Sequence, residues 1–185
     1  MIRISGGFLK GKKIRAPNIS PLRPTLEKTR SAIFDTLVSR FQLKDYCVID
    51  LFAGSGALGF EALSRGAAKA VFIENNKKLF SGLKNTAEEL KVGEFCTFFL
   101  SDALNWIQDL SVNASKSLFL VDPPYKSNLS QKVLELLAHN KIDLTNSLVV
   151  IEESKRSEID IPECFLVIKQ KIFGDTQLYF LEFKI

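Results

Sequence analysis

The chain has 185 residues, of which 46% are hydrophobic and 25% charged, a composition typical of a globular domain and unlike disordered, collagenous or disulfide-rich proteins. No apolar run approaches the roughly 18 residues of a membrane span and no secretory leader is evident, so we expect a cytoplasmic protein without membrane contact. The three cysteines lie far apart and His139 is the single histidine, so we expect no metal site.

The excess of positive charge is confined to the N-terminal end. Residues 1–30 contain eight lysines and arginines and one acidic residue, whereas the remaining residues carry slightly more acidic than basic side chains. Such an end could bind nucleic-acid phosphates, or it could be a solvated surface without a partner, and charge alone leaves both open. The cations considered for RNA contact are Arg3, Lys10, Lys12, Lys13, Arg15, Arg23 and Arg30.

The first elements in chain order are small. Residues 2–5 and 12–15 alternate in polarity around glycines, which predicts a short β-hairpin with too few apolar residues to fold alone. Three prolines then indicate a linker, and Thr25 can cap a helix with apolar residues at helical spacing. We therefore assign residues 1–22 to a basic hairpin and linker, and residues 23–185 to the main domain.

From residue 46 onward, short β-rich runs alternate with helical stretches. This alternation predicts an α/β fold, a Rossmann-like, mostly parallel sheet with helices on both faces. Residues 165–172 and 177–183 have no helix between them, so they should form an antiparallel hairpin at the sheet edge. The expected strands cover 47–52, 70–73, 95–100, 118–121 and 148–151, and the expected helices cover 58–65, 77–90, 103–110 and 130–138.

A glycine-rich loop follows the first of these strands. Gly54, Gly56 and Gly59 have the G-x-G-x-x-G spacing between a strand and a helix, the context in which this spacing indicates nucleotide binding. Glu74 ends the next strand, where a carboxylate can accept both hydroxyls of an adenosine ribose. Asp50, directly before the loop, would repel a pyrophosphate but attract the amino group of S-adenosylmethionine.

Asp102 follows the third strand and has two possible roles. Its carboxylate could accept from the adenine amino group, with the backbone amide of Ala103 beside it, or it could cap the helix over 103–110. The sequence leaves these roles equally open.

A second candidate functional loop follows the fourth strand and has the sequence Asp122-Pro123-Pro124-Tyr125. An exocyclic amine of a nucleobase is a poor nucleophile because its lone pair is delocalised into the ring. Asp122 and the Pro123 carbonyl can each accept one N–H and turn that lone pair toward a methyl donor, while Tyr125 offers a stacking face. The alternative is a strand-ending turn whose Asp122 accepts local amides.

Together these segments resemble the class I S-adenosylmethionine-dependent methyltransferases, and the basic start, Arg23-Pro24-Thr25 and Gly174-Asp175-Thr176 narrow the resemblance to the RsmD family. The resemblance implies methylation of a guanine N2 amino group in 16S ribosomal RNA by a monomer, either on naked RNA or within an assembling small ribosomal subunit. It assigns catalysis to Asp122, Pro123, Pro124 and Tyr125, and cofactor binding to Asp50, Phe52, Ala53, Gly54, Ser55, Gly56, Gly59, Glu74, Asp102, Ala103 and Thr25.

Three other functions compete with this interpretation. An adenine-N6 methyltransferase acting on DNA or RNA could use the same Asp122 and Tyr125, although the chain has no insertion large enough for a separate DNA-reading domain. A nucleic-acid-binding module that lost its activity would not need its glycine loop or Asp122. A nicotinamide oxidoreductase would have no use for Asp50 or the Pro-Pro-Tyr turn.

Overall fold

The computed structural model describes residues 1–15, 24–110, 116–124, 128–139 and 143–184, with the backbone alone described for 24–26. A seven-stranded sheet runs in the order β5-β4-β3-β6-β7-β9-β8. Strands β3 (Cys47–Asp50), β4 (Lys69–Glu74), β5 (Cys96–Leu100), β6 (Ser117–Val121) and β7 (Leu148–Ser154) are parallel neighbours, whereas β8 (Phe165–Phe173) and β9 (Thr176–Phe183) form an antiparallel hairpin. The expected mixed sheet is confirmed.

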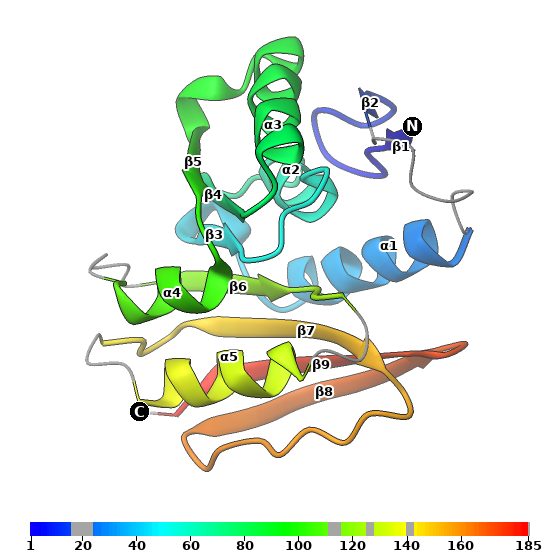
Figure 1. Cartoon of the computed structure of the whole chain (residues 1–185). Coiled ribbons are helices and arrows are strands. Elements are labelled where there is room, and N and C mark those ends of the chain that lie inside the picture. Colours follow the sequence, from blue (N-terminus) through cyan, green and yellow to red (C-terminus); the bar gives the residue numbers. More distant parts are fainter. Residues whose placement is uncertain (16–23, 111–115, 125–127, 140–142, 185) are drawn as a thin grey trace.

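Helices cover both faces of this sheet (Figure 1). One face carries α4 (Ala103–Gln108) and α5 (Leu129–Ala138), and the other carries α1 (Pro24–Val38), α2 (Ala57–Ser64) and α3 (Lys77–Leu90). Two 3₁₀ turns, η1 (Leu43–Asp45) and η2 (Gly93–Phe95), precede β3 and β5. None of the helices in the described ranges is long and apolar enough to span a membrane.

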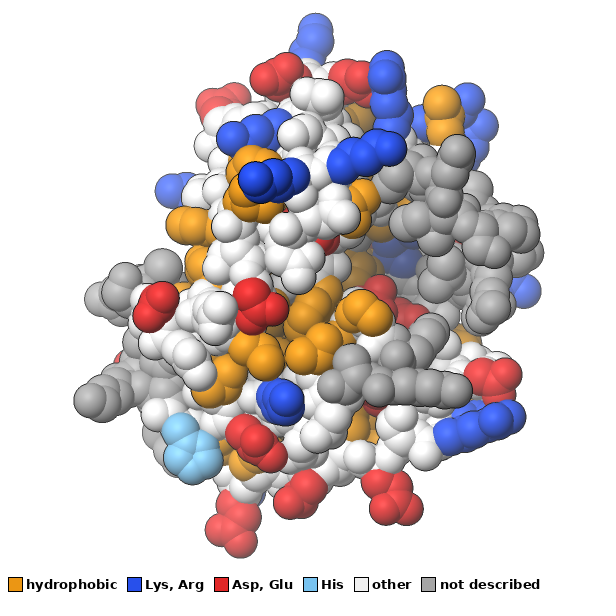
Figure 2. Space-filling model, viewed as in Figure 1, with side chains coloured by type: hydrophobic (Ala, Val, Ile, Leu, Met, Phe, Trp, Pro, Cys, Tyr) orange, Lys and Arg blue, Asp and Glu red, His pale blue; other side chains and the backbone are white. Residues whose placement is uncertain are grey.

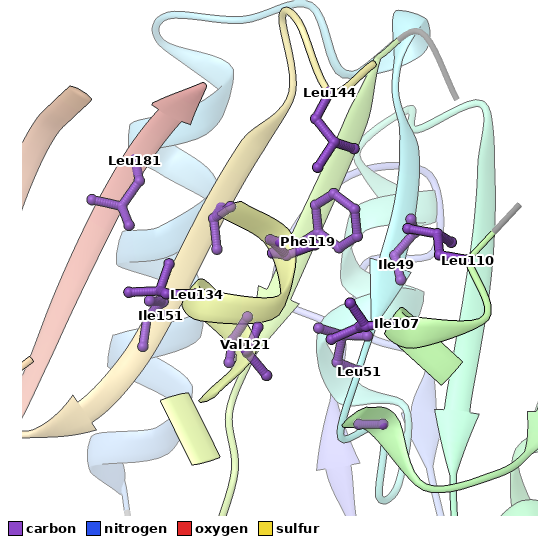
Figure 3. Close-up of a cluster of buried hydrophobic side chains, with 14 of the residues drawn as sticks. Ile49, Leu51, Ile107, Leu110, Phe119, Val121, Leu134, Leu144, Ile151 and Leu181 are labelled. Atoms are coloured by element: carbon purple, nitrogen blue, oxygen red, sulfur yellow. The ribbon is translucent and has the colours of Figure 1, made fainter. Parts of the chain in front are cut away.

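Alternation along the strands sends neighbouring residues to opposite layers. Ile49, Phe119 and Ile151 pack against α4 and α5 in the cluster of Figure 3, while Leu120 and Val150 pack against α1 on the other face. Parallel strands covered on both faces need apolar residues at consecutive positions, which explains the uninterrupted apolar runs of β6 and β7.

The N-terminal hairpin joins β1 (Ile2–Arg3) and β2 (Lys13–Ile14) in antiparallel pairing, as predicted. Its buried side chains Ile4, Leu9 and Ile14 belong to the same apolar cluster as Phe60 of α2 and Leu83 of α3. The hairpin is therefore packed on the main domain and adds three anchor residues to that core.

One detail differs from the sequence-based expectations, and another adds to them. The first long helix begins at Pro24, so Thr25 lies within its first turn and is not the residue that precedes it. A proline at the first helical position lacks only an N–H that no helical carbonyl would accept, which explains the earlier start. At the other end, β9 lies between β7 and β8, so the edge strand is β8 and the last strand of the chain is internal.

Candidate active site at the carboxyl edge of the sheet

The glycine loop is a tight connection between β3 and α2. Gly56 precedes α2 and has a φ of 78°, a left-handed backbone conformation that residues other than glycine rarely adopt. Gly59 lies in the first turn of α2, where an added Cβ would come within 2.3 Å of the Phe72 ring on β4. The loop thus keeps α2 close to the sheet, and its remaining members Phe52, Ala53, Gly54 and Ser55 lie at the carboxyl end of β3.

Glu74 links this loop to the end of β4. One carboxylate oxygen accepts from the Gly54 amide at 2.8 Å, and the other accepts from the Asn76 amide at the same distance. Each carboxylate oxygen has two acceptor positions, so Glu74 can hold the loop and still accept from a ligand. The predicted ribose contact stays a prediction.

Asp50 lies beneath the loop and is only 2% exposed. Its Oδ2 accepts from the Gly59 amide at 3.0 Å. The pKa of Asp50 is raised to about 7, mainly by burial; the hydrogen bond from Gly59 lowers it in part, and the charge of Glu74 acts in the same direction as burial. A cation bound at this position would favour the ionised carboxylate.

Asp122 follows the last residue of β6, the strand next to β3. Asp50 pairs with Leu120, so the alternation of β6 extended by one step brings Asp122 to the same face as Asp50, two residues further toward the carboxyl edge. Burial raises the pKa of Asp122 well above its ordinary value, and the charges of Glu152, Asp50 and Glu153 raise it further. Asp122 and the glycine loop thus share one edge of the sheet.

Pro123 is buried and Pro124 is exposed, so the turn after β6 crosses from the core to the surface. Figure 2 shows hydrophobic side chains along a hollow in this face of the molecule, between the part that carries α3 and the part that carries α5. Tyr125, predicted to stack on the base, and Arg23 lie outside the described residues, as does the side chain of Thr25.

The sequence analysis missed two acidic residues at this edge. Glu152 and Glu153 lie near the carboxyl end of β7, the strand next to β6, and both are buried, with 5% and 7% exposed. Their signal was available, since two glutamates directly follow the apolar run 148–151 where a parallel strand should end beside Asp122.

Asp102 adopts the capping geometry at the start of α4. Its Oδ1 accepts from the amides of Leu104 at 2.9 Å and Asn105 at 3.2 Å. The helix-capping role is therefore confirmed, and Ala103 begins the helix. Contact with adenine, the other role left open, stays a prediction for Asp102 and Ala103.

The cations predicted to contact RNA divide into two groups. The described members Arg3, Lys10, Lys12, Lys13 and Arg15 are exposed, with Arg15 in a surface ion pair with Glu89. Arg30 is instead 5% exposed, and its guanidinium donates to Glu61 at 3.3 Å and to the Arg3 carbonyl at 2.5 Å. An arginine held this way stabilises the fold and does not present its charge to RNA phosphates, so we drop Arg30 from the expected RNA contacts.

Glu61 of α2, also missed from sequence, is the centre of that buried contact. It is fully buried and accepts from the Ser5 amide at 2.8 Å, the Ser5 hydroxyl at 2.7 Å and Arg65 at 2.8 Å. Burial alone would raise the pKa of Glu61, but the bonds from Ser5 and Arg65 and the Arg30 charge bring it below its ordinary value. Glu61 thereby attaches the hairpin and α1 to α2.

Among the described residues, no group of three or more His, Cys, Asp or Glu side chains is arranged to hold a metal ion. An organic cation with hydrogen-bond donors suits buried carboxylates whose pKa values are raised.

Known proteins resemble this chain over nearly its whole length. Residues 2–182 match the family model described as Conserved hypothetical protein 95. The chain is 36% identical over 178 residues to the "Ribosomal RNA small subunit methyltransferase D" of Buchnera aphidicola subsp. Acyrthosiphon pisum, covering 96% of this chain and 91% of that relative. It is 31% identical to the protein of the same name from Haemophilus influenzae, with 94% and 89% covered.

A solved structure shares the fold as well as the sequence. The protein named "Putative methyltransferase yhhF from Escherichia coli" superimposes with a TM-score of 0.83 at 27% identity, covering all of this chain and 98% of that one. The hairpin, the sheet and the terminal β8–β9 pair are thus all part of the shared architecture.

Proposed function

This chain belongs to the RsmD family, the family described as Conserved hypothetical protein 95, and from that premise we propose that it methylates the N2 amino group of a guanine in 16S ribosomal RNA. The methyl donor we propose is S-adenosylmethionine. The observation that carries the proposal is that Asp50 and Asp122 end neighbouring strands on one face, beside a glycine loop, in a chain whose relatives are named rRNA methyltransferases.

The donor set fits this cofactor in charge and in hydrogen bonding. S-adenosylmethionine carries an ammonium and a sulfonium, and the buried Asp50 lies where a cation would offset the repulsion among the carboxylates. Glu74 and Asp102 supply acceptors at the ends of β4 and β5 for the ribose and the adenine, and the glycine loop allows the close approach of a ligand. Bound there, the cofactor supplies an electrophilic methyl group.

The chain itself positions the guanine amine and accepts its proton. We propose that the Asp122 carboxylate and the Pro123 carbonyl each accept one N–H of the amine, which localises the nitrogen lone pair. Burial and the neighbouring carboxylates raise the pKa of Asp122, so Asp122 also suits the removal of the proton that the amine must lose after methyl transfer. Tyr125 would provide the stacking face.

The hairpin is the proposed RNA contact. Its exposed cations Arg3, Lys10, Lys12, Lys13 and Arg15 surround a loop that is anchored by buried residues, so their positions relative to the sheet edge are fixed. Phosphate contacts of this kind supply affinity without reading the sequence.

The deciding experiment is transfer of a tritiated methyl group to total RNA from cells that lack this enzyme, followed by nucleoside analysis. We expect the label in N2-methylguanosine from small-subunit rRNA. Label in N6-methyladenosine would establish the adenine alternative, and the absence of transfer to naked RNA and to small-subunit particles would refute the proposal. Calorimetry should show S-adenosylmethionine binding without added metal.

A further inference from the structure

Glu152 occupies a position next to Asp122 for which the function described so far gives no role. Strands β6 and β7 pair in register with Val121 opposite Ile151, so the next residues, Asp122 and Glu152, are neighbours across two parallel strands. Paired strands lie about 4.8 Å apart, a spacing at which two carboxyl groups can contact one small ligand.

The face on which Glu152 lies is set by the packing of β7. Val150, two residues earlier, packs in the cluster with α1, so Glu152 points to the same side as Val150, and Asp122 to the same side as Leu120. The charge of Glu152 is the largest electrostatic influence on Asp122 after burial. The two carboxyl groups therefore lie close together on the face that also holds Asp50.

Glu153 provides the contrast. It points to the other face, where its carboxylate accepts from Ser130 of α5 at 2.8 Å, from Ser157 at 3.2 Å and from the Ser154 amide at 2.8 Å. These donors come from the chain itself, and Glu153 lines a separate pocket of about 230 Å³ beside α5. Glu153 thus has a structural task on the α5 side of the sheet, whereas Glu152 lies on the Asp122 side.

Guanine presents two adjacent donors on one edge, the N2 amino group and the N1–H. Adenine has a lone pair at N1, which a facing carboxylate repels. We infer that Glu152 accepts the guanine N1–H while Asp122 accepts from the N2 amine, so that the β6–β7 pair selects guanine over adenine. This inference rests on the proposed function and adds a specificity-determining residue to it.

The test compares guanine with 2-aminopurine, which keeps the N2 amine but has a lone pair at N1. The substrate is a fragment of small-subunit rRNA that contains the methylated position, ligated with either base there. For the unaltered protein we expect kcat/KM to favour guanine by at least about 100-fold, because a site built around a donor rejects an analogue that lacks it. A preference below about threefold would overturn the inference without any variant.

The variant Glu152→Gln keeps the shape of the side chain but can donate to a lone pair at N1. We expect it to lower kcat/KM on guanine about 100-fold and on 2-aminopurine less than about threefold, with S-adenosylmethionine affinity within about twofold of the unaltered protein. The matched control Glu153→Gln, on the other face, should keep the original preference for guanine. Equal losses on both bases, or an unchanged preference in Glu152→Gln, would reject the role of Glu152.

The experiments distinguish failure of the proposed function from failure of the inference about Glu152. If the unaltered protein methylates no guanine in RNA, the proposed function and this inference fall together. If it methylates guanine but the base preference does not respond to Glu152, the inference alone is wrong.

Discussion

Two acidic centres, Glu61 fully buried and Asp122 partly buried, lie on the same side of the sheet and differ in what surrounds them. Glu61 is held by Arg30, Arg65 and Ser5, and its pKa is lowered. Asp122 has Glu152 and Asp50 as its strongest electrostatic neighbours, and its pKa is raised.

These different surroundings distinguish a carboxylate that stabilises the fold from one that is suited to bind a ligand. A buried carboxylate with cations and donors around it is stabilised in its ionised form by the chain alone. Carboxylates that face one another store an unfavourable energy that a bound cation or donor can relieve, and such arrangements concentrate at functional sites. In this protein the first arrangement attaches the N-terminal hairpin, and the second is the one that we propose binds the cofactor and the base.

The largest expected effect comes from Glu61. Glu61→Gln should lower the free energy of unfolding by about 3 kcal/mol, since it leaves Arg30 and Arg65 buried without their full counter-charge. Because the pKa of folded Glu61 lies below that of the unfolded chain, its contribution is present above the ordinary glutamate pKa and is lost as the pH falls through the folded value. Urea unfolding followed by circular dichroism measures both.

The matched control for this variant is Asp35→Asn. Asp35 is the exposed partner of Arg65, with 67% of its side chain accessible, so its loss should cost at most about 1 kcal/mol. If both variants lowered the free energy of unfolding equally, the buried contact of Glu61 would be no more important for stability than the surface ion pair of Asp35.

Asp122→Ala should lower kcat about 100- to 1,000-fold, the usual effect of removing a group that stabilises developing charge. Affinity for S-adenosylmethionine should stay within a few-fold, because the proposed cofactor contacts lie on β3, β4 and β5. Single-turnover methyl transfer and calorimetry separate the two quantities. Near-normal turnover would show that Asp122, like Glu61, has a structural role and not a catalytic one.

Cofactor affinity should depend on pH through Asp50. Its raised pKa of about 7 means that a cation must displace a proton at lower pH, so affinity should fall about tenfold per pH unit below 7 and level off above it. Calorimetry from pH 5.5 to 8 in two buffers of different ionisation heat should detect proton release. Asp50→Asn should bind more weakly and lose this pH dependence, and a constant affinity in the unaltered protein would contradict the assignment.

The smallest effect is expected at the hairpin surface. Lys12→Ala should weaken RNA binding slightly and lower the slope of log affinity against log salt by about 0.7 to 0.9, the contribution of one phosphate contact. Lys116, next to Asp45 at the opposite edge of the sheet, is the control, and Lys116→Ala should leave the slope unchanged. Equal slopes for both variants would show that Lys12 does not contact an RNA phosphate, and they would contradict the proposed RNA contact of the hairpin.

Much of the fold follows from local pattern. The apolar runs and the strand–helix alternation predict each strand of the main sheet within about two or three residues, because two-sided burial leaves an uninterrupted apolar signal. The glycine spacing and Asp122 were visible because each marks the end of a strand.

What the sequence did not predict depends on contacts between distant segments. Arg30 is a surface cation by composition, and only the folded chain brings it to Glu61, 31 residues away. Likewise, Glu152 gains its meaning from the register of β6 against β7, which no local pattern specifies. Asp102 was ambiguous for a related reason, since capping and ligand contact use the same carboxylate.

The internal position of β9 has a consequence for how the molecule is made. Residues 176–183 follow β7 and β8 in the chain yet lie between them in the sheet, so β7 keeps an unpaired edge until these residues have been synthesised. The sheet can close only after β9 has joined it, and a nascent chain that stalls before β9 would expose the unpaired edges of β7 and β8 where the folded protein has a continuous sheet. The risk of aggregation through strand edges should therefore be greatest before β9 is in place.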